Sequence, residues 1–156
     1  MKICVFSDSH GCPDNMLRAI ELEKPALCFF LGDGERDLEP VRQRFPSLAI
    51  HAVRGNCDLR SELPKFLCCA VGGLRVFAAH GHLYDVKYDP LLQELCGAAK
   101  REGADVLLFG HTHRAHREHS RGMEILNPGP IGSAARPSYG LLHIDGGQAE
   151  AEIKYL

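Results

Sequence analysis

Short apolar runs that each end in a turn recur along the chain. The first two, Ile3 to Phe6 and Ala26 to Leu31, are apolar without alternation, as in strands buried on both faces. Between them, the segment DNMLRAIELEK places apolar residues at helical spacing, with Asp14 as the expected N-cap. Leu38 to Phe45 fits a second, shorter helix, and Leu48 to Val53 fits a third strand. The first third of the chain therefore predicts an α/β arrangement that begins with a βαβ unit.

The pattern changes in the middle of the chain. The segment FLCCAVGGLRVFAAHG is two apolar stretches joined by a Gly-Gly pair, which is typical of a β-hairpin. Asp89 to Arg101 predicts a helix with Pro90 at its first position, and Asp105 to Phe109 predicts another buried strand. From residue 110 onward short β segments alternate with turns, and we expect no helix beyond residue 102. The expected architecture is a sandwich of two sheets with helices outside.

Composition narrows the class of protein. A chain of 156 residues is long enough for one domain with a real core, so we expect a single domain over residues 1–156. With 18 basic and 20 acidic side chains, its net charge of -2 gives no reason to expect a nucleic-acid or membrane-surface partner. No leader opens the sequence MKICVFSDSHG, and no apolar run approaches the roughly 20 residues that a membrane helix needs. We therefore expect a cytoplasmic protein.

The seven cysteines agree with a reducing compartment. They are odd in number and include no CxxC pair, so they suggest neither a disulfide framework nor a zinc knuckle. Most lie in apolar runs, where a reduced cysteine acts as a small core residue. Only Cys57 lies among polar residues.

Polar residues gather where the predicted strands end. The carboxyl ends of strands form the ligand-binding edge of an α/β sheet, so we expect the clusters to meet in one crevice. Mixed carboxylate, amide and imidazole donors suit Mn²⁺, Fe²⁺, Co²⁺, Ni²⁺ or Zn²⁺, whereas calcium prefers oxygen alone. Seven such ligands are too many for one ion and fit two ions that share a bridging carboxylate. The polar residues at the predicted strand ends, from which these ligands would come, are Asp8, His10, Asp33, Asn56, Asp58, His80, His82, His111 and His113.

The order of these motifs, D-x-H, G-D, G-N-x-D, H-G-H and G-H-T-H, resembles the calcineurin-like metallophosphoesterase superfamily. The stretches VRGNCD and HGHxxDVK are most similar to its small bacterial and archaeal phosphodiesterases. The resemblance extends from Asp8 to Asn127 and implies a four-layer αββα sandwich, in which helices flank two mixed β-sheets. It also implies how the two metals are held: one by Asp8, His10 and His113, the other by Asn56, His80 and His111, with Asp33 bridging them.

The chemistry implied by the resemblance is hydrolysis of a small phosphate ester without a covalent intermediate. Two divalent ions would generate a bridging hydroxide for in-line attack, with Mn²⁺ expected first and Ni²⁺, Fe²⁺, Co²⁺ or Zn²⁺ left open. We expect Asp58 to fix the tautomer of a ligand histidine and His82 to lie close enough to contact substrate. Relatives often form homo-oligomers, but no apolar stripe of the sequence identifies an interface.

Cys57 departs from the family pattern. Many members carry G-N-H-[DE], where the histidine can protonate or stabilise the leaving oxygen. A thiol is a poor substitute, so we expect activated aryl esters to react faster than alkyl esters, and diesters to be preferred over monoesters. A phosphomonoesterase remains an alternative. A further alternative is a protein-interaction scaffold of the same fold, although all seven ligand positions are intact here.

Each motif also has a plain structural interpretation. Asp8 and His10 alone would fit a turn, and His51 and His143 lie in apolar strand patterns where core or edge positions are expected. The basic run RAHREHSR is expected to be a solvated edge strand. Only the joint occurrence of five motifs favours a metal centre.

Overall fold

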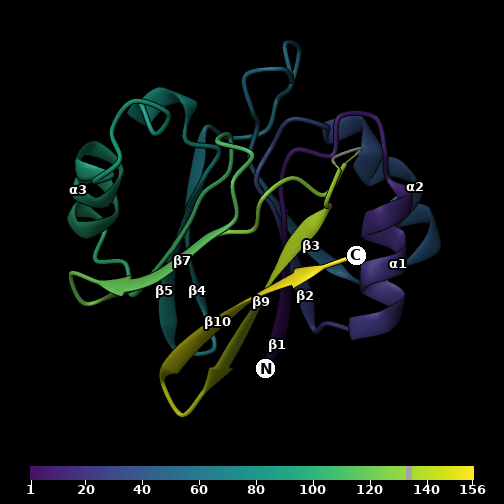
Figure 1. Ribbon diagram of the computed structural model, residues 1–156. Helices are drawn as coiled ribbons and strands as arrows, with labels where there is room; N and C mark the ends of the chain where they lie inside the picture. The colour runs from purple at the N-terminus through teal and green to yellow at the C-terminus, as the bar shows by residue number, and fades with distance from the viewer. Residues whose placement is uncertain (133–134) are drawn as a thin grey trace.

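Two β-sheets lie face to face at the centre of the molecule, with helices on both outer sides (Figure 1). The computed structural model describes residues 1–132 and 135–156. The first sheet has the order β10-β9-β1-β2-β3. Its strands are β1 (Lys2–Phe6), β2 (Leu27–Phe30), β3 (Ala49–Ala52), β9 (Ser138–Asp145) and β10 (Gln148–Tyr155). The second has the order β4-β5-β6-β8-β7. Its strands are β4 (Phe66–Val71), β5 (Leu74–Ala79), β6 (Val106–Leu108), β7 (His116–Ser120) and β8 (Met123–Asn127).

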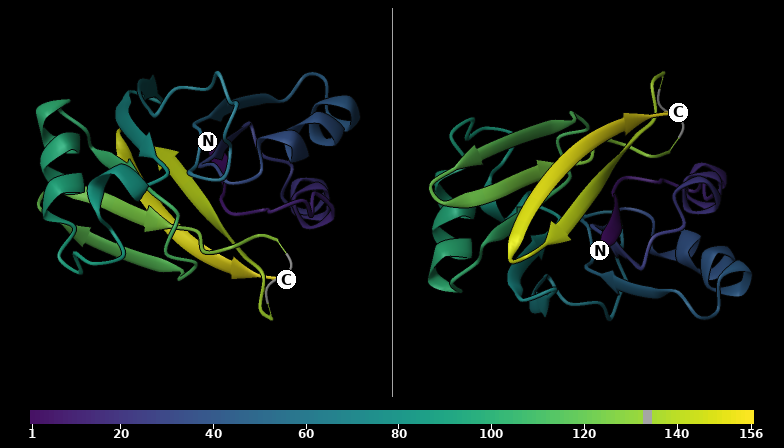
Figure 2. Two further views of the ribbon diagram at one scale, coloured as in Figure 1. Left: turned by 90° about the horizontal axis from the view of Figure 1, so that it is seen from above. Right: turned by 90° about the horizontal axis from the view of Figure 1, so that it is seen from below.

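Both sheets are mixed. Strands β1, β2 and β3 run parallel, whereas β9 and β10 are antiparallel additions to the first sheet. In the second sheet β5, β6 and β8 run parallel, and β4 and β7 are antiparallel edges. The helices of the first third of the chain lie outside the first sheet, and the helix of residues 93–101 lies outside the second (Figure 2). The helices are α1 (Asp14–Glu23), α2 (Leu38–Arg44) and α3 (Gln93–Arg101), with 3₁₀ turns η1 (Glu35–Asp37) and η2 (His82–Tyr84). The expected αββα sandwich is confirmed.

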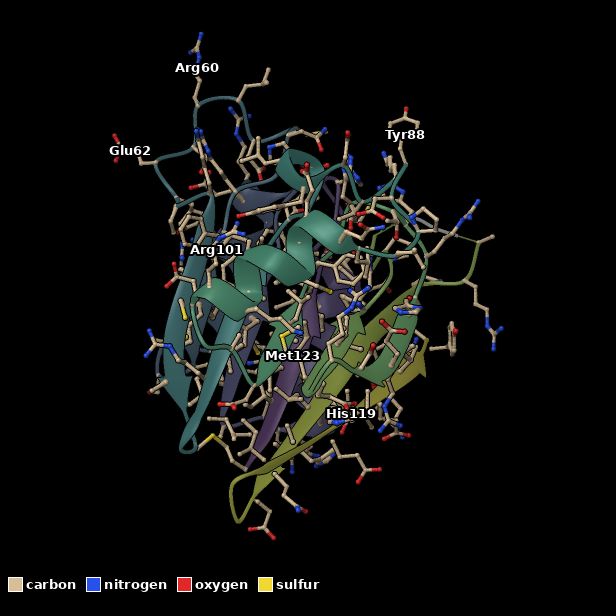
Figure 3. All side chains as sticks on the ribbon, turned by 90° about the vertical axis from the view of Figure 1, so that its left-hand side faces the viewer. Arg60, Glu62, Tyr88, Arg101, His119 and Met123 are labelled. Atoms are coloured by element: carbon tan, nitrogen blue, oxygen red, sulfur yellow. The ribbon has the colours of Figure 1, made fainter. Side chains whose placement is uncertain are left out.

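Cover on both faces explains why the strands read as unbroken apolar runs. In β1, Ile3 and Val5 pack between the sheets, whereas Cys4 and Phe6 pack beneath α1 and α2. A third apolar cluster lies beneath α3 and includes Met123 (Figure 3). Side chains on both faces of a strand are therefore removed from water. Each face contributes hydrophobic free energy, about 25 cal/mol per Å² of apolar surface buried.

The Gly-Gly hairpin is confirmed as expected. Gly72 and Gly73 join β4 to β5 with φ angles of 59° and 86°. Two successive positive φ values are what a two-residue turn needs to match the twist of its flanking strands. The buried strands and α2 also lie within two residues of their predicted positions.

Two helix starts were predicted wrongly. Helix α1 has Pro13 as its N-cap residue and no side-chain cap, so Asp14 is its first residue rather than its cap. Helix α3 begins at Gln93 rather than at Pro90, because Leu92 adopts a left-handed φ of 50°. The carboxylate of Asp89 accepts the N–H groups of residues 91 and 93, which holds this bend ahead of the helix.

The loops that follow the parallel strands gather at one end of the sandwich, at the top of Figure 1. Asp8 N donates to Gly32 O at 3.0 Å, and Gly110 N donates to His80 O at 3.0 Å, so neighbouring loops are bonded to each other. Among the described residues α3 is the last helix, as expected, and none of the helices in that part of the chain is long and apolar enough to cross a membrane.

Candidate metal centre

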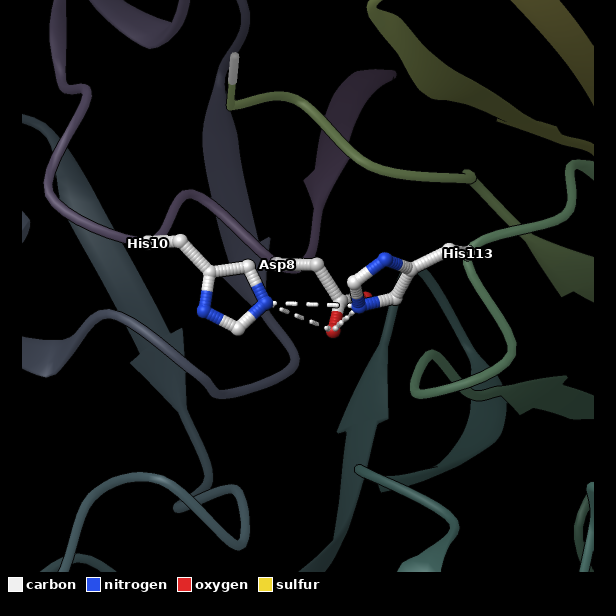
Figure 4. Close-up of side chains that lie close together, drawn as sticks. All are labelled: Asp8, His10 and His113. Atoms are coloured by element: carbon white, nitrogen blue, oxygen red, sulfur yellow. Dashed lines mark hydrogen bonds and ion pairs between the residues drawn. The ribbon is translucent and has the colours of Figure 1, made fainter. Parts of the chain in front are cut away.

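The loops after β1 and β6 bring Asp8, His10 and His113 together, and these three are called the Asp8 group (Figure 4). Asp8 Oδ1 lies 3.1 Å from His113 Nε2 and 3.8 Å from His10 Nε2. The two ring nitrogens are 3.3 Å apart. Three donor atoms from two sheets thus face one small volume.

The Asp8 group fits a cation. Asp8 is 1% exposed, and its Oδ1 accepts no hydrogen bond from the described residues, because the nearby His113 nitrogen is outside hydrogen-bond geometry. A buried carboxylate oxygen without a donor is costly unless a charge compensates it. The side chains of His10 and His113 are 38% and 48% exposed, so this group is open to solvent.

The loops after β2, β5 and β6 form a second cluster, the Asp33 group, made of Asp33, His80 and His111. His80 Nε2 lies 3.3 Å from Asp33 Oδ2 and 3.2 Å from the side-chain oxygen of Asn56. His80 Nδ1 lies 2.7 Å from Leu31 O, and because a carbonyl only accepts, Nδ1 must be the donor. With Nδ1 as the donor, the lone pair of Nε2 in the neutral form of the ring points toward Asp33 and Asn56.

Asp33 lies where the two groups meet. Its carboxylate clusters with His80 and His111 on one side and with His10 and Cys57 on the other. Burial alone would raise the pKa of Asp33, but the hydrogen bonds with His80 and the Cys57 N–H hold this pKa well below its ordinary value. Asp33 is therefore a buried carboxylate that stays ionised, which suits a bridging ligand.

Five of the seven expected ligands have left-handed backbone conformations. For residues other than glycine this conformation costs roughly 1–2 kcal/mol each, and such strain concentrates at functional sites. The five φ angles are 57° at Asp8, 46° at His10, 60° at Asp33, 67° at His111 and 55° at His113. Asp and His adopt this conformation more readily than most residues but still at a cost, so surrounding contacts must help to hold the set.

Asp58 provides one such set of contacts. Its two carboxylate oxygens accept four backbone N–H groups, at 2.8–3.0 Å, from residues 33, 34, 35 and 55. Burial raises the pKa of Asp58, but these four N–H bonds lower it below its ordinary value. The sequence suggested that Asp58 would orient a ligand histidine; the structure shows it bonded to backbone instead, joining the loop of Asp33 to the loop of Asn56.

Close approach of these two loops depends on glycine. Gly32 has a φ of 98°, and a Cβ atom there would collide with the backbone of Gly55. Any side chain at residue 32 would therefore separate Asp33 from the loop that carries Asn56 and Asp58.

Asp37 is a contributor that the sequence did not indicate. Its carboxylate accepts Ser9 Oγ at 2.5 Å and Gly11 N at 2.8 Å, so it holds the residues on both sides of His10. Asp37 lies in η1, outside every motif, and it is a buried carboxylate that is only 7% exposed. No sequence signal would have identified it.

The histidines in and beside the Asp33 group have pKa values shifted in different directions. Burial lowers the pKa of His80, but Asp33 and Asp8 outweigh burial and raise this pKa above its usual value. Burial, His80 and Lys87 lower the pKa of His111 to about 4. His82 lies 5.4 Å from His80 between ring centroids, and burial followed by the charge of His80 lowers its pKa. His82 and His111 are therefore neutral imidazoles near pH 7.

Cys57 lies on the exposed side of the centre. Its Sγ accepts the Asn56 amide at 3.3 Å, and its own N–H donates to Asp33 Oδ1 at 2.7 Å. Burial and the neighbouring Asp33 charge raise the pKa of the Cys57 thiol to about 11. The residue is thus a neutral thiol near pH 7, which is a weak acid for a leaving oxygen.

The remaining histidines lie away from the centre. His51 in β3 packs against Phe29 with ring centroids 5.2 Å apart, and His143 is exposed in β9. The basic run forms β7, an edge strand as expected, where Arg117 and His119 both contact the buried carboxylate of Glu124.

Comparison with known proteins agrees with this geometry. Residues 1–147 match the family described as calcineurin-like phosphoesterase superfamily domain. The probable metallophosphoesterase YsnB of Bacillus subtilis is 33% identical over 132 residues, which cover 84% of this chain and 75% of YsnB. The phosphodiesterase YfcE of Escherichia coli is 30% identical over 174 aligned positions, which cover 93% of this chain and 89% of YfcE.

Solved structures share the fold. A conserved protein of Streptococcus pneumoniae, described as a predicted phosphoesterase, has a TM-score of 0.79 at 25% identity and covers 98% of this chain and 97% of its own. Zinc-complexed Vps29 of Entamoeba histolytica has a TM-score of 0.77 at 22% identity, with 99% of each chain covered. The family match, the relatives and the clustered ligands agree, and the chain belongs to the calcineurin-like phosphoesterase superfamily.

Proposed function

We propose that the chain is a two-metal phosphodiesterase in which residues 1–156 form one domain. The observation that carries this proposal is the position of Asp33, whose carboxylate clusters with ligands of both groups. The ligands we assign are Asp8, His10 and His113 to one ion, and Asn56, His80 and His111 to the other, with Asp33 between them.

The donor set supports Mn²⁺ as the first metal to test, with Ni²⁺, Fe²⁺, Co²⁺ and Zn²⁺ as the others. When bound, two such ions would supply an acidified water as nucleophile and neutralise charge on the phosphoryl oxygens. The residues of the chain hold this arrangement in place. Leu31 O orients His80, Asp37 fixes the loop of His10, and Asp58 fixes the loops of Asp33 and Asn56.

His82 is assigned a substrate-contacting role. Its ring lies 6.1 Å from His111 and 5.4 Å from His80 between centroids, and its Nδ1 is buried without a partner among the described residues. Because its pKa is lowered, the ring is neutral and can donate one hydrogen bond to an ester oxygen without adding charge.

Diesters are favoured over monoesters because of Cys57. A neutral thiol with a pKa raised to about 11 cannot act as the acid that a poor leaving group needs. A monoester dianion also needs more positive charge near its leaving oxygen than a diester does. The residue we assign to that position is Cys57, whose neutral thiol supplies none.

The test compares hydrolysis of bis(p-nitrophenyl) phosphate and p-nitrophenyl phosphate by chelator-stripped protein, with and without added Mn²⁺. Asp33→Ala removes the shared ligand. Asp145→Ala, which removes an exposed carboxylate at the end of β9, is the matched control. We expect metal-dependent diester cleavage that is lost in Asp33→Ala and kept in Asp145→Ala. Cleavage of the monoester alone would identify a phosphatase. Inactivity with every metal would favour a scaffold instead.

A further inference from the structure

A cavity of about 770 Å³ opens directly beside the candidate centre. It is lined by His10, Asp33 and Cys57 of that centre, by residues of η1 and α2, and by the loop of residues 57–61. The volume is in the range of sites that bind small molecules. A phosphodiester held at the centre would therefore place one of its two arms in this cavity.

Three arginines line the cavity: Arg36 in η1, Arg42 in α2 and Arg60 in the loop after β3. In the part of the chain that the structure describes, none of the three guanidinium groups has a carboxylate within 4.0 Å or a hydrogen bond. Arg60 lies at the rim, where its side chain projects beyond the fold (Figure 3). By contrast, Arg44 in the same helix as Arg42 pairs with Glu21 at 3.0 Å.

The acidic side chains of the cavity wall are mostly engaged elsewhere. Asp37 accepts Ser9 and Gly11, and Asp58 accepts four backbone N–H groups. Glu39 accepts the Gln43 amide at 2.8 Å. Glu35 is the exception, since its side chain has no partner among the described residues. The hydrogen-bond donors left for a ligand in this cavity are therefore mainly the three guanidinium groups.

We propose that this cavity receives a second phosphate group of the substrate. A guanidinium presents its N–H groups in a planar fork that matches two phosphate oxygens. All three arginines are exposed to solvent, and Arg36 and Arg42 are carried by η1 and α2, whereas Arg60 lies in a loop. The inference rests on the proposed phosphodiesterase function and specifies its substrate class: a diester in which one arm carries a further phosphate, as a nucleoside bisphosphate ester does.

The experiment measures competitive inhibition of bis(p-nitrophenyl) phosphate hydrolysis by two ligands that differ by one phosphate. These are thymidine 5′-monophosphate and thymidine 3′,5′-bisphosphate. The readout is the ratio of their inhibition constants within each protein, so a general effect on the centre cancels. We compare the unsubstituted chain, the double variant Arg36→Gln/Arg42→Gln, and Arg44→Gln as the matched control from α2.

We expect the bisphosphate to inhibit about tenfold more tightly than the monophosphate, as expected for charge-assisted bonds partly exposed to solvent. The ratio should fall to about one in the double variant and stay unchanged in Arg44→Gln. The same preference should weaken as salt is raised. Equal inhibition by both ligands in the unsubstituted chain, or a preference that survives in the double variant, would overturn the proposal.

The two proposals fail in different ways. Absence of bis(p-nitrophenyl) phosphate cleavage with every metal would reject the phosphodiesterase, whereas cleavage without a bisphosphate preference would reject the cavity assignment alone. If cleavage is absent, calorimetric titration of both thymidine nucleotides into the same three proteins still decides whether the arginines bind the second phosphate.

Discussion

The Asp33 group and the Asp8 group use the same ligand types in different surroundings. His80 has no exposed surface, and its Nδ1 is bonded to Leu31 O. His10 and His113 have side chains 38% and 48% exposed, and among the described residues no acceptor is bonded to their Nδ1 atoms. His80 is therefore oriented by the fold itself, whereas the rings of His10 and His113 would be oriented mainly by what they bind.

The largest expected effect is a difference in stability between a variant of the Asp33 group and a variant of the Asp8 group. His80→Ala removes a fully buried ring, leaves Leu31 O without its donor and takes away the His80 partner of Asp33 Oδ2. We therefore expect a loss of about 2–4 kcal/mol in the free energy of unfolding. His10→Ala removes an exposed ring and should change this free energy by less than about 0.5 kcal/mol. Urea unfolding in the presence of chelator measures both. Equal losses of unfolding free energy in the two variants would show that His80 is no more important to the fold than His10.

Asp58→Asn should act on both groups through the loops. The amide keeps the size of the side chain but loses the charge and the acceptor capacity that hold four backbone N–H groups. We expect kcat/KM for bis(p-nitrophenyl) phosphate to fall about 10- to 100-fold, as for residues that orient metal ligands. Asp105→Asn, whose carboxylate accepts a single backbone N–H from Arg75, is the matched control. Activity that survives intact in Asp58→Asn would show that these bonds are dispensable.

Metal removal should sharpen the contrast further. The ion at the Asp33 group should be retained about tenfold more tightly than the ion at the Asp8 group, since orienting hydrogen bonds raise affinity by about this factor. Chelator titration followed by measurement of protein-bound Mn²⁺ should therefore show two steps. His113→Ala should abolish the step at low chelator and keep the other. Loss of both ions in one step would contradict the expected difference in affinity between the two groups.

Cys57 offers the smallest expected effect. In the unsubstituted chain, diester cleavage should depend steeply on the pKa of the leaving alcohol, because the thiol provides little acid catalysis. Cys57→His should raise the rate for alkyl leaving groups by about three- to tenfold and leave aryl esters nearly unchanged. Cys57→Ser is the control for loss of sulfur. A flat dependence in the unsubstituted chain would show that leaving-group protonation does not limit the reaction.

The sequence predicted the parts of this structure that depend on periodicity and strand ends. Unbroken apolar runs identified strands covered on both faces, and the polar residues after them do converge. The start of α3 could not be predicted, because it depends on the left-handed conformation of Leu92, a residue with no local preference for it. Propensity favoured a helix from Pro90, and the Asp89 bonds outweighed it.

The supporting contacts were also beyond the sequence. Asp58 was recognised as important from its motif, but its four backbone partners depend on how two loops approach each other. Asp37, Arg36 and Arg42 belong to no motif, and their relation to the centre arises from the packing of η1 and α2 beside it. Motifs report the donors of such a centre, whereas the contacts that position those donors are properties of the folded chain.

The left-handed backbone at five candidate ligands has a consequence for substitution at those positions. Each of these φ angles is strained for a residue other than glycine, although Asp and His bear that strain more readily than most residues. Glycine would relieve the strain, whereas alanine would keep it and remove the donor atom. The same loops would therefore be built more easily from glycine, so the strain at these five positions is tied to the side chains that they present.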